Sequence, residues 1–251
     1  MFIVWGKKHV YRKIGFISDF CPLCRDITMF RIDRLGIAGH LYYISVGQGE
    51  FVGHIKKCLG CKTSLNGNPD IYREISKKRL EPSELQRLTF PNIQTHYAER
   101  LKLEQMLRHS PSSVPSDTRS ALIKEPFQLL NPSVEKRFSA MQIDVETALT
   151  LMSAVVLVPT FWALCNHFIP AYEGAFLSVL LLIGIGAVTA QGFLQTGRYF
   201  NNKVFPVLVP ALKPLRPTAV EITAVIAELK KADLKFGKKL KQKALVDRLN
   251  S

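Results

Sequence analysis

Acidic residues are scarce in this sequence: 20 Asp and Glu stand against 34 Lys and Arg, and the formal charge at pH 7 is +14. Such a deficit of negative charge favours a polyanionic neighbour, which is either nucleic acid or an anionic membrane surface. A solvated basic surface without a partner also explains it. The net charge therefore favours a polyanionic partner but does not distinguish nucleic acid from a membrane surface.

Several familiar signals are missing. The opening MFIVWGKKHVYRK has an apolar run of only five residues, and its basic residues follow that run, so we expect no secretory signal. The sequence contains no phosphate-binding loop, nucleophile elbow or H-E-x-x-H motif. Asp19 and Asp26 flank a cysteine pair but have no partner base in the sequence pattern. We therefore expect a protein that is not an enzyme.

Two segments lack charge altogether. Residues 148–169 and 175–194 contain no Lys, Arg, Asp or Glu, and runs of about 18 to 20 helical residues extend about 27–30 Å, the thickness of the hydrocarbon layer. Buried core helices are the alternative, but both segments are apolar all round rather than along one stripe. The pattern predicts a transmembrane hairpin, in which small residues such as Gly186 and Gly192 let the helices approach closely.

The segment that connects the two runs, NHFIPAYEGA, has no Lys or Arg, whereas the flanks carry five basic residues: Lys136, Arg137, Arg198, Lys203 and Lys213. Basic flanks stay on the cytoplasmic side. We therefore expect an integral membrane protein of a bacterial inner membrane with both termini cytoplasmic. That compartment keeps thiols reduced, which suits metal-binding cysteines.

The remaining segments predict an α+β membrane protein. Residues 1–68 are β-rich, and 40–57 form a hairpin pattern around Gly47 and Gly49. Residues 69–144 form a cytoplasmic helical segment, in which Asn131 caps a new helix that starts at Pro132. Residues 145–196 hold the transmembrane hairpin. Residues 197–251 form a basic helical tail, in which Thr218 and Glu221 have the spacing of a capping box.

The chain has five cysteines, and four of them form two C-x-x-C pairs: Cys21 with Cys24, and Cys58 with Cys61. An odd total with this pairing disfavours a secreted disulfide scaffold. Two such pairs joined by a hairpin can place four thiolates in a tetrahedron, which is a closed, structural zinc site. Iron in the same four-thiolate arrangement, a dithiol redox couple and four unmetallated thiols are the alternatives.

The pairs CPLC and CLGC resemble those of the zinc-ribbon class. The chain as a whole, with its F-x-x-W-G stretch at residues 2–6, is similar to uncharacterised bacterial membrane-anchored zinc-ribbon proteins. The resemblance implies architecture and metal, but no activity. One departure stands out: ribbon turns often carry glycine after the second cysteine, whereas this chain has Arg25 and Lys62, so we expect tighter or distorted turns.

Three functions follow from these features. The first is an adaptor, in which the zinc ribbon recruits a protein partner at the cytoplasmic face. The second is a membrane-tethered nucleic-acid binder, because residues 1–80 carry fourteen Lys and Arg against six acids, with aromatics interleaved. The third is an accessory subunit of a membrane enzyme or transporter, which requires oligomerisation. Anionic lipid headgroups explain the basic segments equally well, and a homo-oligomer is compatible with the small residues of the second run.

Overall fold

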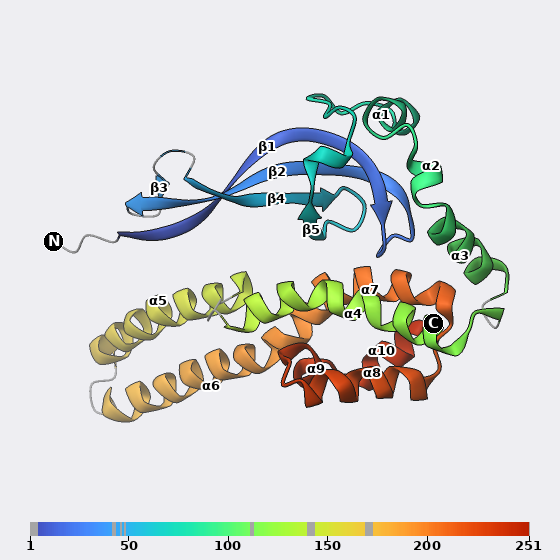
Figure 1. Cartoon of the computed structure of the whole chain (residues 1–251). Helices are drawn as coiled ribbons and strands as arrows, with labels where there is room; N and C mark the ends of the chain where they lie inside the picture. The colour runs from blue at the N-terminus through green and yellow to red at the C-terminus, as the bar shows by residue number, and fades with distance from the viewer. Residues whose placement is uncertain are drawn as a thin grey trace. The chain divides into compact units, whose positions relative to one another are not determined.

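A computed structural model of the chain describes residues 5–41, 44–45, 47, 49–110, 113–139, 144–168 and 173–250. Its N-terminal region is an antiparallel sheet of β1 (Trp5–Cys21), β2 (Asp26–Leu41), β3 (Ile44–Ser45), β4 (Glu50–Cys58) and β5 (Ser64–Gly67). The strand order is β1-β2-β4-β5, and β3 pairs with β2 (Figure 1). An N-terminal sheet followed mostly by helices agrees with the predicted α+β class.

Burial in the sheet increases toward its cysteine end: the first half of β1 is mostly exposed, whereas residues 17–21 are all buried. Ile17, Phe30 and Ile32 are fully buried, while Lys7, Lys8 and other residues of the first half of β1 are exposed. The hairpin predicted within residues 40–57 is wrong in its pairing: β4 pairs with residues 30–37 of β2, and among the described residues only His40 and Leu41 pair within the predicted segment, with β3. Gly49, directly before β4, has φ +70, and a Cβ there would lie 2.5 Å from the Ile37 backbone.

After the sheet come a 3-10 turn, η1 (Pro69–Ile71), and four helices: α1 (Pro82–Thr89), α2 (Ile93–His96), α3 (Ala98–His109) and α4 (Ser116–Ser139). The predicted helix start at Asn131 and Pro132 is wrong, because α4 runs through both residues. A proline inside a helix removes one backbone hydrogen bond. Phe127, Leu130 and Val134 are buried on one face across that point, and their packing outweighs the lost bond.

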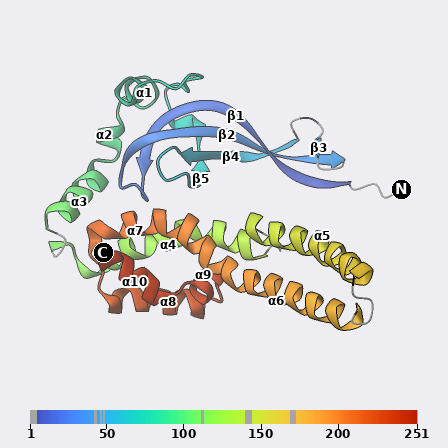
Figure 2. The same cartoon turned by 180° about the vertical axis from the view of Figure 1, so that it is seen from behind.

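The two uncharged segments form α5 (Val145–Phe168) and α6 (Glu173–Tyr199), which run side by side in Figures 1 and 2. Both helices are long and apolar enough to cross a membrane, and the two apolar windows are only 6% and 0% buried. A core helix of a soluble protein would be mostly buried. The second window extends to Leu215, but its 38 residues would span about 57 Å, well beyond a hydrocarbon layer of about 30 Å.

Close packing between α5 and α6 occurs at a glycine that the sequence analysis did not single out. A Cβ at Gly184 would lie 3.7 Å from Val158 and 3.9 Å from Ala154, whereas nothing lies within 4 Å of one at Gly186 or Gly192. Helical periodicity explains the difference between Gly184 and Gly186, because a residue two positions along a helix points to the opposite side. The expectation that Gly186 and Gly192 provide the contact with the first helix is therefore wrong.

The chain continues through a π-helical turn, η4 (Phe200–Val204), into α7 (Phe205–Leu212), the 3-10 turn η5 (Lys213–Leu215), α8 (Ala219–Lys231), α9 (Lys235–Lys239) and α10 (Gln242–Asn250). The predicted capping box is confirmed: the Thr218 N–H donates to Glu221 Oε2 at 2.7 Å, and the Glu221 N–H donates to Thr218 Oγ1 at 3.2 Å.

The chain divides into two compact units. One comprises Met1–Leu130, Val207–Val225 and Val246–Ser251, and the other comprises Asn131–Pro206 and Ile226–Leu245. The first contains the sheet and the cysteine pairs, and the second contains α5 and α6. The four-segment division drawn from the sequence, with boundaries after residues 68, 144 and 196, stays a prediction. The F-x-x-W-G stretch begins outside the described residues.

Candidate metal centre

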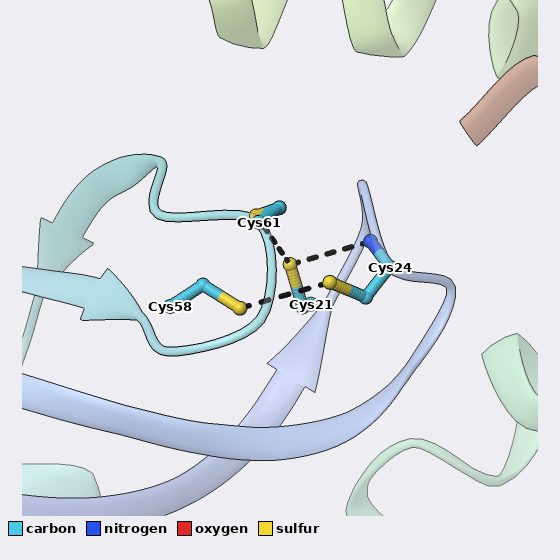
Figure 3. Close-up of side chains that lie close together, drawn as sticks. All are labelled: Cys21, Cys24, Cys58 and Cys61. Atoms are coloured by element: carbon cyan, nitrogen blue, oxygen red, sulfur yellow. Dashed lines mark hydrogen bonds between the residues drawn. The ribbon is translucent and has the colours of Figure 1, made fainter. Parts of the chain in front are cut away.

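The two cysteine pairs lie in two hairpin turns at one end of the sheet. Cys21 ends β1 and Cys24 lies in the turn into β2, while Cys58 ends β4 and Cys61 lies in the turn into β5. Because Phe30 of β2 pairs with Cys58, the second turn lies beside the first. Figure 3 shows the four side chains converging from these turns.

The sulfur distances fit a four-coordinate metal. Cys21 Sγ lies 3.7 Å from Cys61 Sγ, Cys24 Sγ lies 3.7 Å from Cys58 Sγ, and all four atoms lie within 4.8 Å of one another. A disulfide needs about 2.05 Å, so the cysteines are free. A tetrahedron with Zn–S bonds of about 2.3 Å has edges of about 3.8 Å. The cluster is therefore compatible with a zinc ribbon, and iron in a four-thiolate site fits the same distances.

The four sulfurs hydrogen-bond with one another, and the pKa values of Cys58 and Cys61 are lowered while those of Cys21 and Cys24 are raised. The Cys24 N–H donates to Cys21 Sγ at 3.4 Å, and Thr28 Oγ1 lies 3.4 Å from Cys58 Sγ. Hydrogen bonding with the Cys21 sulfur lowers the pKa of the Cys58 thiol and lowers the pKa of Cys61 to about 6. Hydrogen bonding with Cys24 raises the pKa of Cys21. The four groups thus share their protons as one coupled set.

The glycine inside the second pair keeps space for the cluster. A Cβ at Gly60 would lie 3.2 Å from Cys24 Sγ and 3.7 Å from Cys58 Sγ. A contact of 3.2 Å is tight for a carbon against a sulfur that a metal would hold in place. Gly60 therefore allows the second turn to approach the sulfur of the first.

The residues after the second cysteine of each pair adopt left-handed backbone: φ is 55° at Arg25 and 63° at Lys62. This conformation favours glycine and costs other residues about 1–2 kcal/mol. Both turns thus adopt the backbone conformation that glycine usually occupies, although neither position is glycine. At Arg25 the reason lies in the side chain.

The Arg25 side chain is 3% exposed and ties the first turn to helices far along the chain. Its guanidinium makes two hydrogen bonds of 3.0 Å to Glu104 of α3, and its Nε donates to the Ala211 carbonyl of α7 at 2.6 Å. Its Nη2 donates to the Leu122 carbonyl of α4 at 3.4 Å. One residue of the metal turn thus anchors three helices, which the sequence pattern did not reveal.

A second buried cluster surrounds Asp19, two residues before Cys21. Its carboxylate is 0% exposed, pairs with the Lys56 ammonium, and accepts hydrogen bonds from the hydroxyls of Tyr72 and Tyr97. Burial, together with the Asp19 charge, raises the pKa of both tyrosines. Lys56, which comes shortly before Cys58, thus pairs with Asp19. The cluster joins the strands to the segment that follows them.

No further metal-binding group emerges from the part of the chain that the structure describes. Within it, only the four cysteines bring three or more metal-ligating side chains together. Asp26, the other acid beside the first pair, is exposed and lies 3.8 Å from Arg108. The side chain of Cys165, the fifth cysteine, lies outside the described residues.

Comparison with protein-family models, with curated proteins and with solved structures found no match to this chain. The candidate site therefore stands on its own geometry.

Proposed function

We propose that the chain is a membrane-anchored protein whose zinc-stabilised N-terminal region recruits a protein partner at the cytoplasmic face, and that it is not an enzyme. The observation that carries the proposal is the cluster of four sulfurs, whose spacing matches a closed tetrahedral site. Such a site stabilises a small sheet and leaves no coordination position for a substrate.

Two buried acidic groups linked to the cysteine turns support a structural role. Asp19 is held by Lys56 and two tyrosines, and Glu104 is held by Arg25 and Arg100. A general acid or base needs a proton that it can exchange with a substrate. Both carboxylates are instead buried among permanent partners, which is how a protein stabilises a fold.

A surface on the sheet supports the recruitment of a partner. Phe51 of β4 is 53% exposed on the face of the sheet that carries Arg34, whereas Tyr11 of β1, which pairs with Leu35, lies on the opposite face. The Arg34 guanidinium lies 5.3 Å from the centre of the Phe51 ring. Lys7, Lys8, Arg12 and Lys13 are exposed on β1. Aromatic and arginine side chains are enriched in protein interfaces, and the excess of cations suits an acidic partner.

The full chain, purified in detergent, tests this function. We expect one zinc per chain, no colour, and retention in membranes after carbonate washing. A partner captured by the wild type should be lost with Arg12→Ala/Phe51→Ala, because Arg12 pairs with Arg34 and shares the face of Phe51. It should be kept with Val220→Ala, which truncates an exposed residue of α8. A red protein would indicate iron, carbonate extraction would contradict the anchor, and capture unaffected by the double substitution would contradict the surface.

Nucleic acid is the second candidate occupant of the same surface. Arg12 and Arg34 together with the exposed ring of Phe51 match the combination of cations and aromatic rings that binds single strands. Binding to a single-stranded oligonucleotide should then weaken steeply with salt, because each phosphate contact releases counterions. Capture of a protein partner that is insensitive to nuclease favours the adaptor.

A further inference from the structure

A cavity of about 460 Å³ lies in the second unit, where α5 begins and α6 ends. It lies at the charged ends of the two apolar helices. The charged and aromatic side chains that line it come from α4, α5, α6, η4 and the residue before α5: Arg137, Asp144, Glu146, Arg198, Tyr199 and Lys203.

Arg198 engages both carboxylates of the cavity. Its Nη2 lies 2.8 Å from Asp144 Oδ2, and its Nε lies 2.7 Å from Glu146 Oε2. The same guanidinium donates to Gln191 Oε1 at 2.5 Å, so it links the start of α5 to the last turns of α6. The two acids are therefore occupied by one cation, and three cations against two acids leave the cavity with a net positive charge.

The other two cations are Arg137 and Lys203, and the structure shows what lies around each. The Arg137 guanidinium lies over the Tyr199 ring, 5.8 Å from its centre. Lys203 belongs to the π-helical turn η4, a rare geometry that often occurs at functional sites. Among the described residues, Lys203 forms no ion pair with a carboxylate. An anion placed between these side chains would offset their charge.

The apolar surface beside the cavity indicates what kind of anion fits. Val145, which lines the cavity, is 74% exposed, and Leu149, one turn further along α5, is 64% exposed. Phe193, less than two turns before Arg198 on α6, is 87% exposed. A soluble anion would leave these apolar side chains in contact with water, whereas acyl chains would cover them.

We propose that this cavity is a binding site for an anionic diacyl phospholipid, with its phosphate held by Arg137 and Lys203 and its acyl chains along the start of α5 and the end of α6. This inference rests on the proposed membrane anchoring. Because both carboxylates already pair with Arg198, the site has no acid left for an ammonium headgroup. It therefore favours phosphatidylglycerol over phosphatidylcholine.

Native mass spectrometry of the full chain in detergent tests the site, with dioleoyl-phosphatidylglycerol and dioleoyl-phosphatidylcholine as probes. A cation near a lipid phosphate contributes about fivefold in affinity. Arg137→Gln/Lys203→Gln should weaken phosphatidylglycerol binding about 25-fold. The matched control, Lys136→Gln/Lys213→Gln, removes the same charge from exposed residues that do not line this cavity and should leave binding within about twofold.

Equal losses in the two double variants would overturn the site, because they would show attraction by overall charge. Equal binding of the two lipids would overturn the preference for an anionic headgroup. Inorganic phosphate that displaces the lipid at millimolar concentration would show that the ligand is a free phosphate, and that would also overturn the proposal. Release of the wild type from membranes by carbonate would instead contradict the anchor, so the two proposals fail separately.

Discussion

Two residues with the same backbone and different surroundings show how the metal turns are built. Arg25 and Lys62 each follow the second cysteine of a pair, and each has a positive φ. Lys62 is exposed, and its ammonium reaches only the nearby Leu59 carbonyl. Arg25 is buried and holds Glu104. The left-handed backbone therefore lowers the stability of the fold at Lys62 without compensation, whereas at Arg25 a buried ion pair offsets the loss.

Glycine at each of the two positions should have opposite effects. Lys62→Gly removes the steric cost of the left-handed backbone. It should leave the free energy of unfolding unchanged or raise it by up to about 1 kcal/mol. Arg25→Gly removes the same backbone cost but leaves Glu104 buried without the guanidinium that binds both of its oxygens, and should lower the free energy of unfolding by about 3 kcal/mol. The midpoint of denaturant-induced zinc release, measured in detergent, reports both values. Two substitutions with the same sign would contradict the assigned role of Arg25.

Gly60 gives a second test at the scale of one residue. A methyl group there would press on the Cys24 sulfur, so Gly60→Ala should weaken zinc binding about tenfold without unfolding the zinc-bound sheet. Gly53→Ala, in β4, is the matched control because nothing lies within 4 Å of its added carbon. Competition with a zinc chelator measures both affinities. Equal affinities in the two variants would show that the second turn has room to adjust.

At the scale of single residues, the sequence predicts the four cysteine ligands but not the buried contacts that hold the cysteine turns in place. The spacing of the four cysteines is local and indicates a four-thiolate cluster directly. The partners of Arg25 and Asp19 lie 79 and 53 residues away, at Glu104 and Tyr72. No periodicity links residues so distant, because their contact is made by the folded chain. Arg25 therefore looked like a departure from the usual glycine until its neighbours were known.

At the scale of the helices, a titratable carboxylate, that of Glu221, stabilises the first turn of α8. The Arg119 guanidinium donates to Glu221 Oε1 at 2.7 Å, and that hydrogen bond, with those from Thr218, lowers the pKa of Glu221 from 4.5 to about 2. A carboxyl group with a lowered pKa in the folded state stabilises above its unfolded value and loses that contribution as pH falls. The loss should therefore occur between about pH 4.5 and pH 2.

Hydrogen exchange of the α8 amides across that interval measures this effect. We expect protection of the first turn of α8 to fall as the pH is lowered from about 4.5 to 2, after correction for the intrinsic exchange rate. Glu221→Gln keeps the size of the side chain and should remove this part of the pH dependence. The same dependence in Glu221→Gln would show that another group is responsible.

The pairing of α5 and α6 depends on which side of α6 carries a small residue. Gly184→Leu would insert a large side chain against Val158 and Ala154, so it should separate the two helices. Gly186→Leu should have little effect, because an added carbon there has nothing within 4 Å. Disulfide crosslinking between cysteines introduced at Val155 and Ile185, which line the same groove, measures the pairing. Equal crosslinking in the two leucine variants would contradict the packing at Gly184.

Elements were predicted best where one local pattern decides them. The uncharged runs and the capping box of Thr218 and Glu221 were found from the sequence, whereas the partner of β4 was not, because it lies in residues 30–37, before the predicted hairpin. The helix break at Asn131 was wrong because buried neighbours keep α4 intact through Pro132. The packing role given to Gly186 was wrong because small residues recur on every side of α6, and only the folded pair shows which side meets α5.

Across the whole molecule, apolar side chains are distributed in two ways. In the sheet they are buried, as at Ile17, Phe30 and Ile32. On α5 and α6 they face outward, including Leu182 at 70% and Phe193 at 87% exposed. Such surface is not stable in water, so the hairpin needs a covering, which is the bilayer in our proposal. The charges at its ends then set its orientation.

The orientation itself is the last prediction. Five basic residues flank the hairpin and none lies in its connecting segment, so the connection should face outward and both ends inward. A Cys165→Ala background retains the four cysteines of the cluster. One cysteine is therefore added at Tyr172, Ser139 or Asn250, and labelling by a membrane-impermeant maleimide in intact cells is compared with that of the background alone. Tyr172→Cys should react, and Ser139→Cys and Asn250→Cys should react only after permeabilisation. The reverse pattern would place the four metal-site cysteines in an oxidising compartment, where disulfides compete with metal binding.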